Sequence, residues 1–159
     1  MNLLPETFSV YGDAVYSFFV AGSPAPGGSK RFVGFGKKTG RAILIDDAGA
    51  RNKNWRACVA QVAAQFCKGP LTGALECGFH FVMPRPKAHY RTGKHAGELR
   101  PDAPHYHTTK PDLTKLIRST EDALTGFAWV DDSQLARHSD PTKVYGDTPG
   151  CLIVVRRLT

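Results

Sequence analysis

The segment ALECGFHFVM, residues 74–83, restricts the possible fold of this chain more than any other stretch. Its larger apolar residues occupy every second position, which places them on one face of a β-strand. A strand with one such face must pack against a second layer of secondary structure. The residues on that face are Leu75, Cys77, Phe79, Phe81 and Met83.

Two segments repeat apolar residues with the period of a helix and can form that second layer. The first spans residues 48–67, and the second begins at Leu113. Before the second, Pro111 restrains its neighbour to extended geometry and Asp112 has the residue type of an N-cap. Gly126 is a natural residue to end it. The two apolar stripes are Trp55, Cys58, Val59, Val62, Ala63 and Phe66, and Leu113, Leu116, Ile117, Thr120 and Leu124.

Several other segments have the composition of β-strands. No repeat or domain boundary interrupts the chain, so we predict a single α+β domain over residues 1–159, a mixed sheet packed with two main helices. Residues 127–130 are predicted to be a strand or extended segment after the second helix. The other predicted strands are 15–21, a hairpin over 30–45, 105–110, and an antiparallel pair formed by 134–140 and 151–157.

Residues 84–104 have no periodicity and contain five Lys or Arg residues and four prolines. Loops of this length are usually functional or disordered. We therefore predict a flexible basic loop inside the domain.

The net charge of +7 favours a polyanionic partner, although a solvated basic surface explains it equally well. No apolar run approaches the roughly 18 residues of a membrane span, which predicts no membrane association. The N-terminus lacks the pattern of a signal peptide, so we expect a cytoplasmic protein. The four cysteines form no CxxC pair and are interpreted as reduced thiols.

Three carboxylates flank the second helix. Asp112 precedes it, and Asp131 and Asp132 follow the short run FAWV. Each has a simpler explanation, because Asp112 suits an N-cap and the Asp131–Asp132 pair suits a turn. Taken together, the three acids are better explained by a divalent cation, because Asp131 and Asp132 repel each other and a cap needs no second acidic cluster. Mg²⁺ prefers oxygen ligands of this kind.

The stretch from Lys110 to Leu135 resembles the core motif of RusA-type Holliday junction resolvases, small Mg²⁺-dependent endonucleases common in phages and prophages. The residues that carry the resemblance are Lys110-Pro111-Asp112-Leu113-Thr114-Lys115-Leu116, Arg118, Asp122-Ala123-Leu124, Trp129 and Asp131-Asp132-Ser133-Gln134. It implies a homodimer acting on branched DNA in a bacterial host cell, with roles in recombination and repair. It also implies that Asp112 and Asp132 serve the metal, that Arg118 assists catalysis, and that Asp131 matches the first acid of the pair.

Two positions depart from that family pattern. Thr114 stands where the family has a second acid, and a neutral hydroxyl cannot replace the lost charge. Arg118 stands where the best-known members have lysine, and an arginine cannot donate a proton at neutral pH.

From these residues we predict metal-assisted phosphodiester hydrolysis. Asp112, Asp131 and Asp132 would hold Mg²⁺, with Mn²⁺ as an alternative, and Arg118 would stabilise charge on the phosphate. Two other hypotheses stay open, a non-catalytic binder of branched DNA that has lost part of the metal site and a protein-interaction module. The predicted phosphate contacts are Lys110, Lys115, Lys30, Arg31, Arg85, Lys87, Arg91 and Lys94.

Two histidines and one tryptophan each have a structural and a functional interpretation. His105 and His107 share one face of a predicted strand, and a structural role is favoured over a metal-binding one. Trp129 is expected to pack in the core, with stacking on an unpaired base as the alternative.

Overall fold

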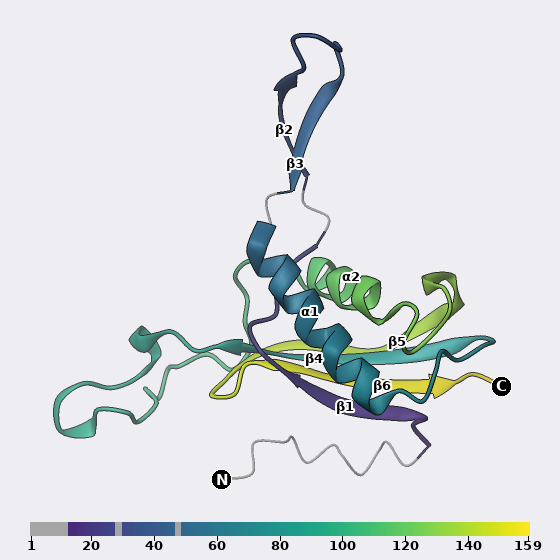
Figure 1. Ribbon diagram of the computed structural model, residues 1–159. Coiled ribbons are helices and arrows are strands. Elements are labelled where there is room, and N and C mark those ends of the chain that lie inside the picture. Colours follow the sequence, from purple (N-terminus) through teal and green to yellow (C-terminus); the bar gives the residue numbers. More distant parts are fainter. Residues whose placement is uncertain (1–12, 28–29, 47–48) are drawn as a thin grey trace.

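The computed structural model describes residues 13–27, 30–46 and 49–159, without the side chains of residues 30–32 and 43–46. A four-stranded sheet carries two helices, α1 (Gly49–Phe66) and α2 (Leu113–Leu124), on one of its faces, as Figure 1 shows. The fold is therefore the predicted α+β type. No helix among the described residues combines the length and the apolar character that crossing a membrane requires.

The sheet has the strand order β1-β6-β4-β5. Its strands are β1 (Tyr16–Ala21), β4 (Leu75–Pro84), β5 (Leu135–Gly146) and β6 (Gly150–Arg157). β6 pairs antiparallel with both β1 and β4, whereas β5 pairs parallel with β4. The predicted antiparallel pair of 134–140 with 151–157 is therefore wrong. Both edges of β6 are already occupied, and α2 returns the chain so that β5 runs in the direction of β4.

The predicted apolar face of β4 is confirmed. Its five alternating side chains from Leu75 to Met83 are at most 5% exposed and form the core with the helices. On α1, Trp55, Val59 and Ala63 are buried as the periodicity predicts. Phe66 ends the stripe but stays 55% exposed, with its ring stacked on Phe18.

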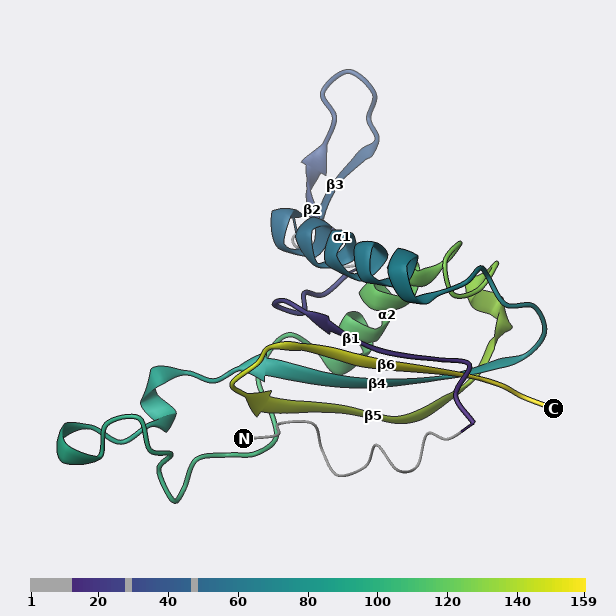
Figure 2. The same ribbon diagram turned by 60° about the horizontal axis from the view of Figure 1, so that its bottom comes forward.

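Two buried polar contacts fix α1 against α2. Ser119 Oγ donates to Asn52 Oδ1 at 2.5 Å, and Trp55 Nε1 donates to Thr120 Oγ1 at 3.1 Å. All four side chains are buried, so water cannot substitute for these bonds. The two helices are therefore joined by buried hydrogen bonds, and Figure 2 shows both on the same side of the sheet.

The segments that precede and follow α2 differ from the predicted strands. Residues 105–110 make only a bridge to β5, in which His107 N donates to Lys143 O at 3.0 Å. Residues 127–130 form a turn rather than a strand, closed by a bond from Gly126 N to Trp129 O. Gly126 has φ +86°, which confirms the predicted glycine at the helix end.

Two extensions leave the body of the fold in Figure 1. The hairpin of β2 (Lys30–Phe35) and β3 (Ala42–Asp46) forms its own two-stranded sheet, with exposed basic side chains near its turn. Residues 84–104, called here the basic arm, contain the 3-10 turns η2 (Lys87–His89) and η3 (Gly93–His95) and a bridge between Tyr90 and Leu99. The arm thus has internal structure, and its mobility stays a prediction.

Glu76 is a buried carboxylate on the opposite face of the sheet, where it is held by two arginines. Its side chain is 7% exposed, Arg156 Nη1 lies 2.8 Å from it, and Arg137 Nε also donates to it. Burial alone would raise the pKa of Glu76, but the hydrogen bonds from the arginines outweigh burial and lower that pKa below its usual 4.5. The ionised form therefore stabilises the fold above pH 4.5, and that contribution is lost as the pH falls through the lowered pKa.

Replacing Glu76 with Gln is expected to lower the free energy of unfolding near neutral pH by roughly 1–3 kcal/mol, since a buried charge-assisted pair is lost. The deficit should shrink in acid, where wild-type Glu76 is itself protonated. Urea unfolding across a pH series measures both effects. Glu98→Gln, which removes an exposed partner of Arg91, is the matched control and should change little. A Glu76→Gln deficit that stays constant down to acid pH would contradict this account.

Candidate functional site

Asp112 occupies the N-cap position of α2 but does not use its side chain as a cap. Its backbone is extended, and no hydrogen bond joins its carboxylate to the helix backbone. The carboxylate instead pairs with Lys115 Nζ at 3.2 Å and is 54% exposed. Because the carboxylate contributes nothing to capping, the simple explanation of Asp112 as an N-cap fails, and its oxygens face solvent.

Lys143 of β5 anchors the backbone just before Asp112. Its ammonium donates to Thr109 O at 2.7 Å and to Pro111 O at 2.6 Å. Burial lowers the pKa of Lys143, while the negative charge of Asp112 opposes that change. Sequence reasoning missed this residue, because a lysine inside a strand has no pattern that distinguishes it from surface lysines.

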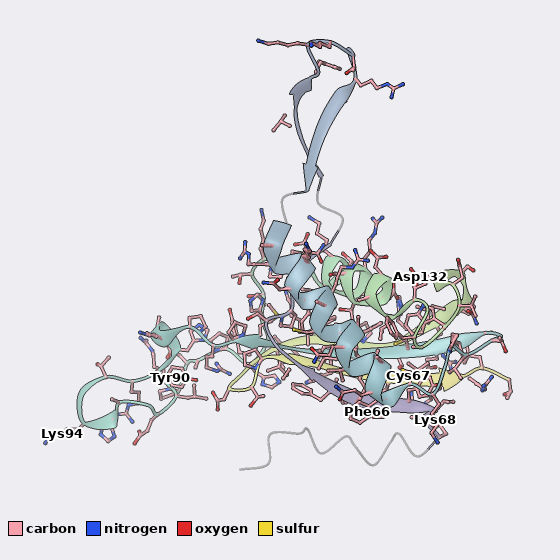
Figure 3. All side chains as sticks on the ribbon, in the orientation of Figure 1. Phe66, Cys67, Lys68, Tyr90, Lys94 and Asp132 are labelled. Carbon is pink, nitrogen blue, oxygen red and sulfur yellow. The ribbon has the colours of Figure 1, made fainter. Side chains whose placement is uncertain are left out.

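Asp132 lies at the other end of α2, as Figure 3 shows. Trp129 Nε1 donates to Asp132 Oδ1 at 2.8 Å, and Thr125 Oγ1 donates to the same oxygen. Trp129 is fully buried, so the expected core packing is confirmed, and stacking of its ring on a base is excluded in this conformation. The indole instead orients the carboxylate of Asp132.

Gln134 holds the turn that carries the acidic pair. Its side-chain oxygen accepts from Val130 N at 2.8 Å and from Asp131 N at 3.0 Å. Its amide nitrogen donates to Leu71 O and Gly73 O, both at 3.0 Å. Asp131 caps the short turn η4 (Asp132–Gln134) by accepting from Ser133 N. Hydrogen bonds from the side chain and then the backbone of Ser133 lower the pKa of Asp131.

Asp112 and Asp132 do not meet within one chain. The helix between them has 12 residues, which at 1.5 Å per residue separates them by about 18 Å. Carboxylates that share one Mg²⁺ need oxygens about 2.0–2.1 Å from the ion. Among the described residues, no group of three or more His, Cys, Asp or Glu side chains is placed to hold a metal. The expected convergence of the three acids therefore fails in a single chain.

Comparison with known proteins decides the family. The family model described as "Endodeoxyribonuclease RusA" matches residues 22–156, most of the 159-residue chain. The chain belongs to the RusA family. It is also 28% identical over 158 residues to the "Uncharacterized protein YqaN" of Bacillus subtilis (strain 168), covering 96% of each chain. This RusA-family member is thus related to endodeoxyribonucleases along nearly its whole length, well beyond the 26-residue motif.

In this RusA-family chain, a second ionisable pair lies near Asp132. Glu121 Oε1 is 2.5 Å from His138 Nε2 on β5. Burial raises the pKa of Glu121, the contact with His138 opposes the shift, and the charges of Asp132 and Asp122 add to it. The C-terminal end of α2 is therefore acidic, and His138 was missed because an isolated histidine gives no pattern.

The predicted basic residues differ in their availability. Lys110 and Arg118 are exposed, and no described residue binds the guanidinium of Arg118. On the basic arm, Lys87 and Lys94 are exposed, and Figure 3 shows Lys94 at its far end. Arg91 is paired with Glu98 at 3.0 Å.

Arg85 is an anchor rather than a free phosphate contact. Its Nη1 donates to Pro104 O at 2.9 Å, and its guanidinium lies 5.3 Å from the centre of the Tyr145 ring. It thus closes the base of the arm, because one arginine links both ends of that segment. The predicted contacts Lys30 and Arg31 begin β2, but their side chains lie outside the described part.

His105 and His107 do not form a metal pair. His107 is buried against the ring of Tyr145, with ring centres 4.7 Å apart, and burial lowers its pKa. His105 packs on its neighbour Tyr106. The structural interpretation of both residues is supported.

Gln134→Ala is expected to loosen the turn that carries Asp132. Four hydrogen bonds disappear, so we expect a loss of about 1–2 kcal/mol in the free energy of unfolding and faster hydrogen exchange at Val130 and Asp131. Gln61→Ala, which removes an exposed amide on α1, serves as the control. Unchanged exchange at both amides in the Gln134 variant would show that the side chain does not hold the turn.

Proposed function

We propose that this RusA-family protein is a metal-dependent endodeoxyribonuclease that cleaves branched DNA such as four-way junctions, as a homodimer, in recombination and repair. The family match supports the nuclease class. An exposed carboxylate that is not used for capping, at Asp112, and one oriented by an indole, at Asp132, support a hydrolytic site. We further propose that the protein acts in the cytoplasm of a bacterial cell and that its gene has a phage or prophage origin.

The separation of the two acids carries the homodimer part of this proposal. A helix of 12 residues keeps Asp112 and Asp132 about 18 Å apart. Two copies related by a two-fold axis, with their α2 helices antiparallel, would bring Asp112 of one copy to Asp132 of the other. The two-fold axis generates two such pairs of Asp112 and Asp132, and two sites match a substrate in which two strands are cut.

The donor set fits Mg²⁺ only when two copies are counted. Asp112 of one copy, with Asp132 and the remaining oxygen of Asp131 from the other, would provide hard oxygen ligands. A bound Mg²⁺ or Mn²⁺ supplies polarisation of a phosphoryl oxygen and activation of water.

The cationic residues of α2 have separate roles in this proposal. Arg118 lies six residues after Asp112, about 9 Å along the axis, with an exposed guanidinium that can stabilise charge on a phosphate. Lys110 lies beside Asp112 and can contact the backbone of the DNA without reading bases. Lys115 already neutralises Asp112, so a bound cation would release it to contact DNA.

One observation favours a second candidate function, a non-catalytic protein that binds branched DNA. Thr114 is exposed on the first turn of α2, two residues after Asp112, where the family pattern has an acid. A synthetic four-way junction separates the two functions. Nicking with Mg²⁺ supports the nuclease, whereas gel retardation in EDTA without nicking under any divalent ion supports the binder.

The composite site predicts that two inactive variants restore each other. Asp112→Asn and Asp132→Asn should each abolish junction cleavage in homodimers. A mixed dimer, co-expressed with two affinity tags, should regain cleavage, because one of its two sites then has both wild-type acids.

Wild-type chains carrying the same two tags are the control for dimer formation. A mixed dimer that binds the junction but stays inactive would show that each site lies within one chain. Recovery of single nicks rather than paired cuts is the expected pattern, since only one site is complete.

Thr114→Asp is expected to lower the Mg²⁺ concentration needed for half-maximal cleavage several-fold. The new carboxylate adds charge near Asp112, and an acid in the first turn of a helix is tolerated by the helix dipole. Thr114→Asn, of similar shape but neutral, is the control. An unchanged Mg²⁺ titration in the Thr114→Asp variant would show that position 114 does not belong to the metal site.

A further inference from the structure

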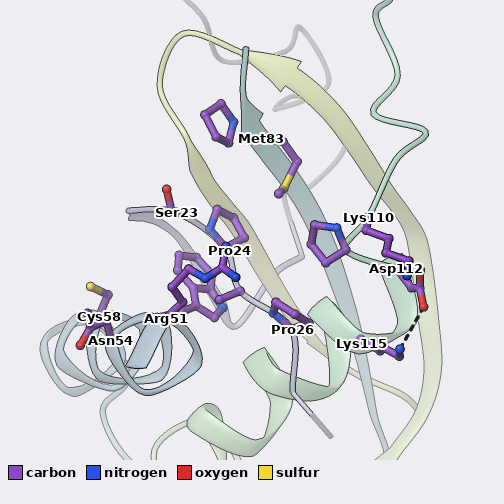
Figure 4. A pocket seen from close by; sticks show the side chains of 14 residues that line it. Ser23, Pro24, Pro26, Arg51, Asn54, Cys58, Met83, Lys110, Asp112 and Lys115 are labelled. Atoms are coloured by element: carbon purple, nitrogen blue, oxygen red, sulfur yellow. Dashed lines mark ion pairs between the residues drawn. The ribbon is translucent and has the colours of Figure 1, made fainter. Parts of the chain in front are cut away.

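A cavity of about 690 Å³ opens directly beside Asp112. Figure 4 shows it between the loop before the hairpin, the first turns of α1, the end of β4 and the start of α2. Its volume falls in the range of about 300–1,000 Å³ typical of sites for small organic groups.

The lining combines apolar walls with a cationic mouth. Pro24, Pro26, Met83 and Pro111 present carbon atoms to the cavity over the buried ring of Trp55. The charged residues at the mouth are Arg51, Lys110, Lys115 and Asp112. Asp112 is the single acid among them and is paired with Lys115, so the mouth has a net positive charge.

Asn54 supplies a polar group at the same site. It is exposed on α1, and its amide has both hydrogen-bond donors and an acceptor. An apolar slot with one amide at its edge and cations around its mouth matches a nucleotide. A base has apolar faces and a polar edge, and the phosphates on either side of it are anionic.

Hydrogen bonds within the chain connect the walls of the cavity. Gly27 N donates to Lys115 O at 3.0 Å, which ties the proline-rich loop to α2. A Cβ at Gly27 would lie 3.2 Å from Ser119 Cα, so a larger residue there would have to displace Ser119 by a few tenths of an ångström. The Ser119–Asn52 and Trp55–Thr120 bonds fix the α1 wall.

The hairpin is inserted in the chain between two walls of this cavity. Residues 23–26 immediately precede it, and residues 51–58 follow it. The hairpin carries the exposed Lys37, Lys38 and Arg41 near its turn. DNA held by the hairpin would pass the cavity mouth.

We propose that this cavity receives one unstacked nucleobase from the DNA strand whose phosphate lies at Asp112, and that Asn54 contacts the edge of that base. The inference rests on the proposed nuclease function and specifies how the DNA is positioned. Branch points favour it, because a base with interrupted stacking costs less to extrude than one in an intact duplex.

The test uses the full-length protein, Ca²⁺ in place of Mg²⁺ to suppress cleavage, and four-way junctions with single 2-aminopurines at positions flanking the crossover. Binding should raise 2-aminopurine fluorescence several-fold at one position. It should also slow alkylation of Cys58, which lines the cavity. Cys67 interferes little, because burial raises its pKa to about 11.

Two matched pairs of variants on α1 locate the effect. Asn54→Trp should block the cavity and abolish the fluorescence rise, whereas Gln61→Trp, at an exposed amide away from the cavity, should not. Arg51→Ala should weaken binding of the junction more than Arg56→Ala, since only Arg51 lines the cavity. Because the blocked cavity no longer holds the base, Asn54→Trp should also lower junction affinity roughly five- to hundredfold.

Three outcomes overturn the inference. The first is junction binding with no fluorescence rise and no protection of Cys58, which would leave the nuclease proposal intact. The second is a rise that persists in Asn54→Trp. The third is protection of Cys58 that depends on protein concentration without DNA, which would assign the cavity to a second copy. Failure of the protein to bind any junction would overturn this inference together with the proposed function.

Discussion

The rigidity of α2 is the constraint on which the rest of the site depends. Its 12 residues hold Asp112 at one end and Asp132 at the other. Buried bonds from Asn52 and Trp55 of α1 hold the helix against its neighbour. A metal site that uses both acids therefore needs two chains, so the proposed catalysis would require the proposed dimer.

Both ends of α2 are held by residues with no direct part in the proposed chemistry. Lys143 binds two carbonyls just before Asp112, and Gln134 makes four bonds around the turn of Asp132. Both connect their end of the helix to the sheet or to the loop that leads into it. The acids are thus positioned by the fold rather than by each other, since the 12-residue helix keeps them about 18 Å apart.

The basic surplus of the chain is likewise divided by structure into two classes. Arg85, Arg137 and Arg156 are committed to carbonyl or carboxylate partners within the fold. Exposed cations, by contrast, are found on α2, on the hairpin and on the basic arm. Net charge alone could not separate anchors from available contacts, because an arginine paired with a distant residue such as Glu76 has the same sequence signature as a free one.

Local pattern was sufficient to predict the apolar face of β4, the bounds of both helices to within a residue or two, and the motif that names the family. Periodicity reports which side of one element is buried, and that property is local. The pairing of β5 with β4, the conversion of FAWV to a turn, and the roles of Lys143 and Gln134 were decided only by tertiary structure. Each depends on a partner far along the chain. The separation of Asp112 and Asp132 was also seen only in the structure, because their spacing in sequence does not show that a straight helix holds them apart.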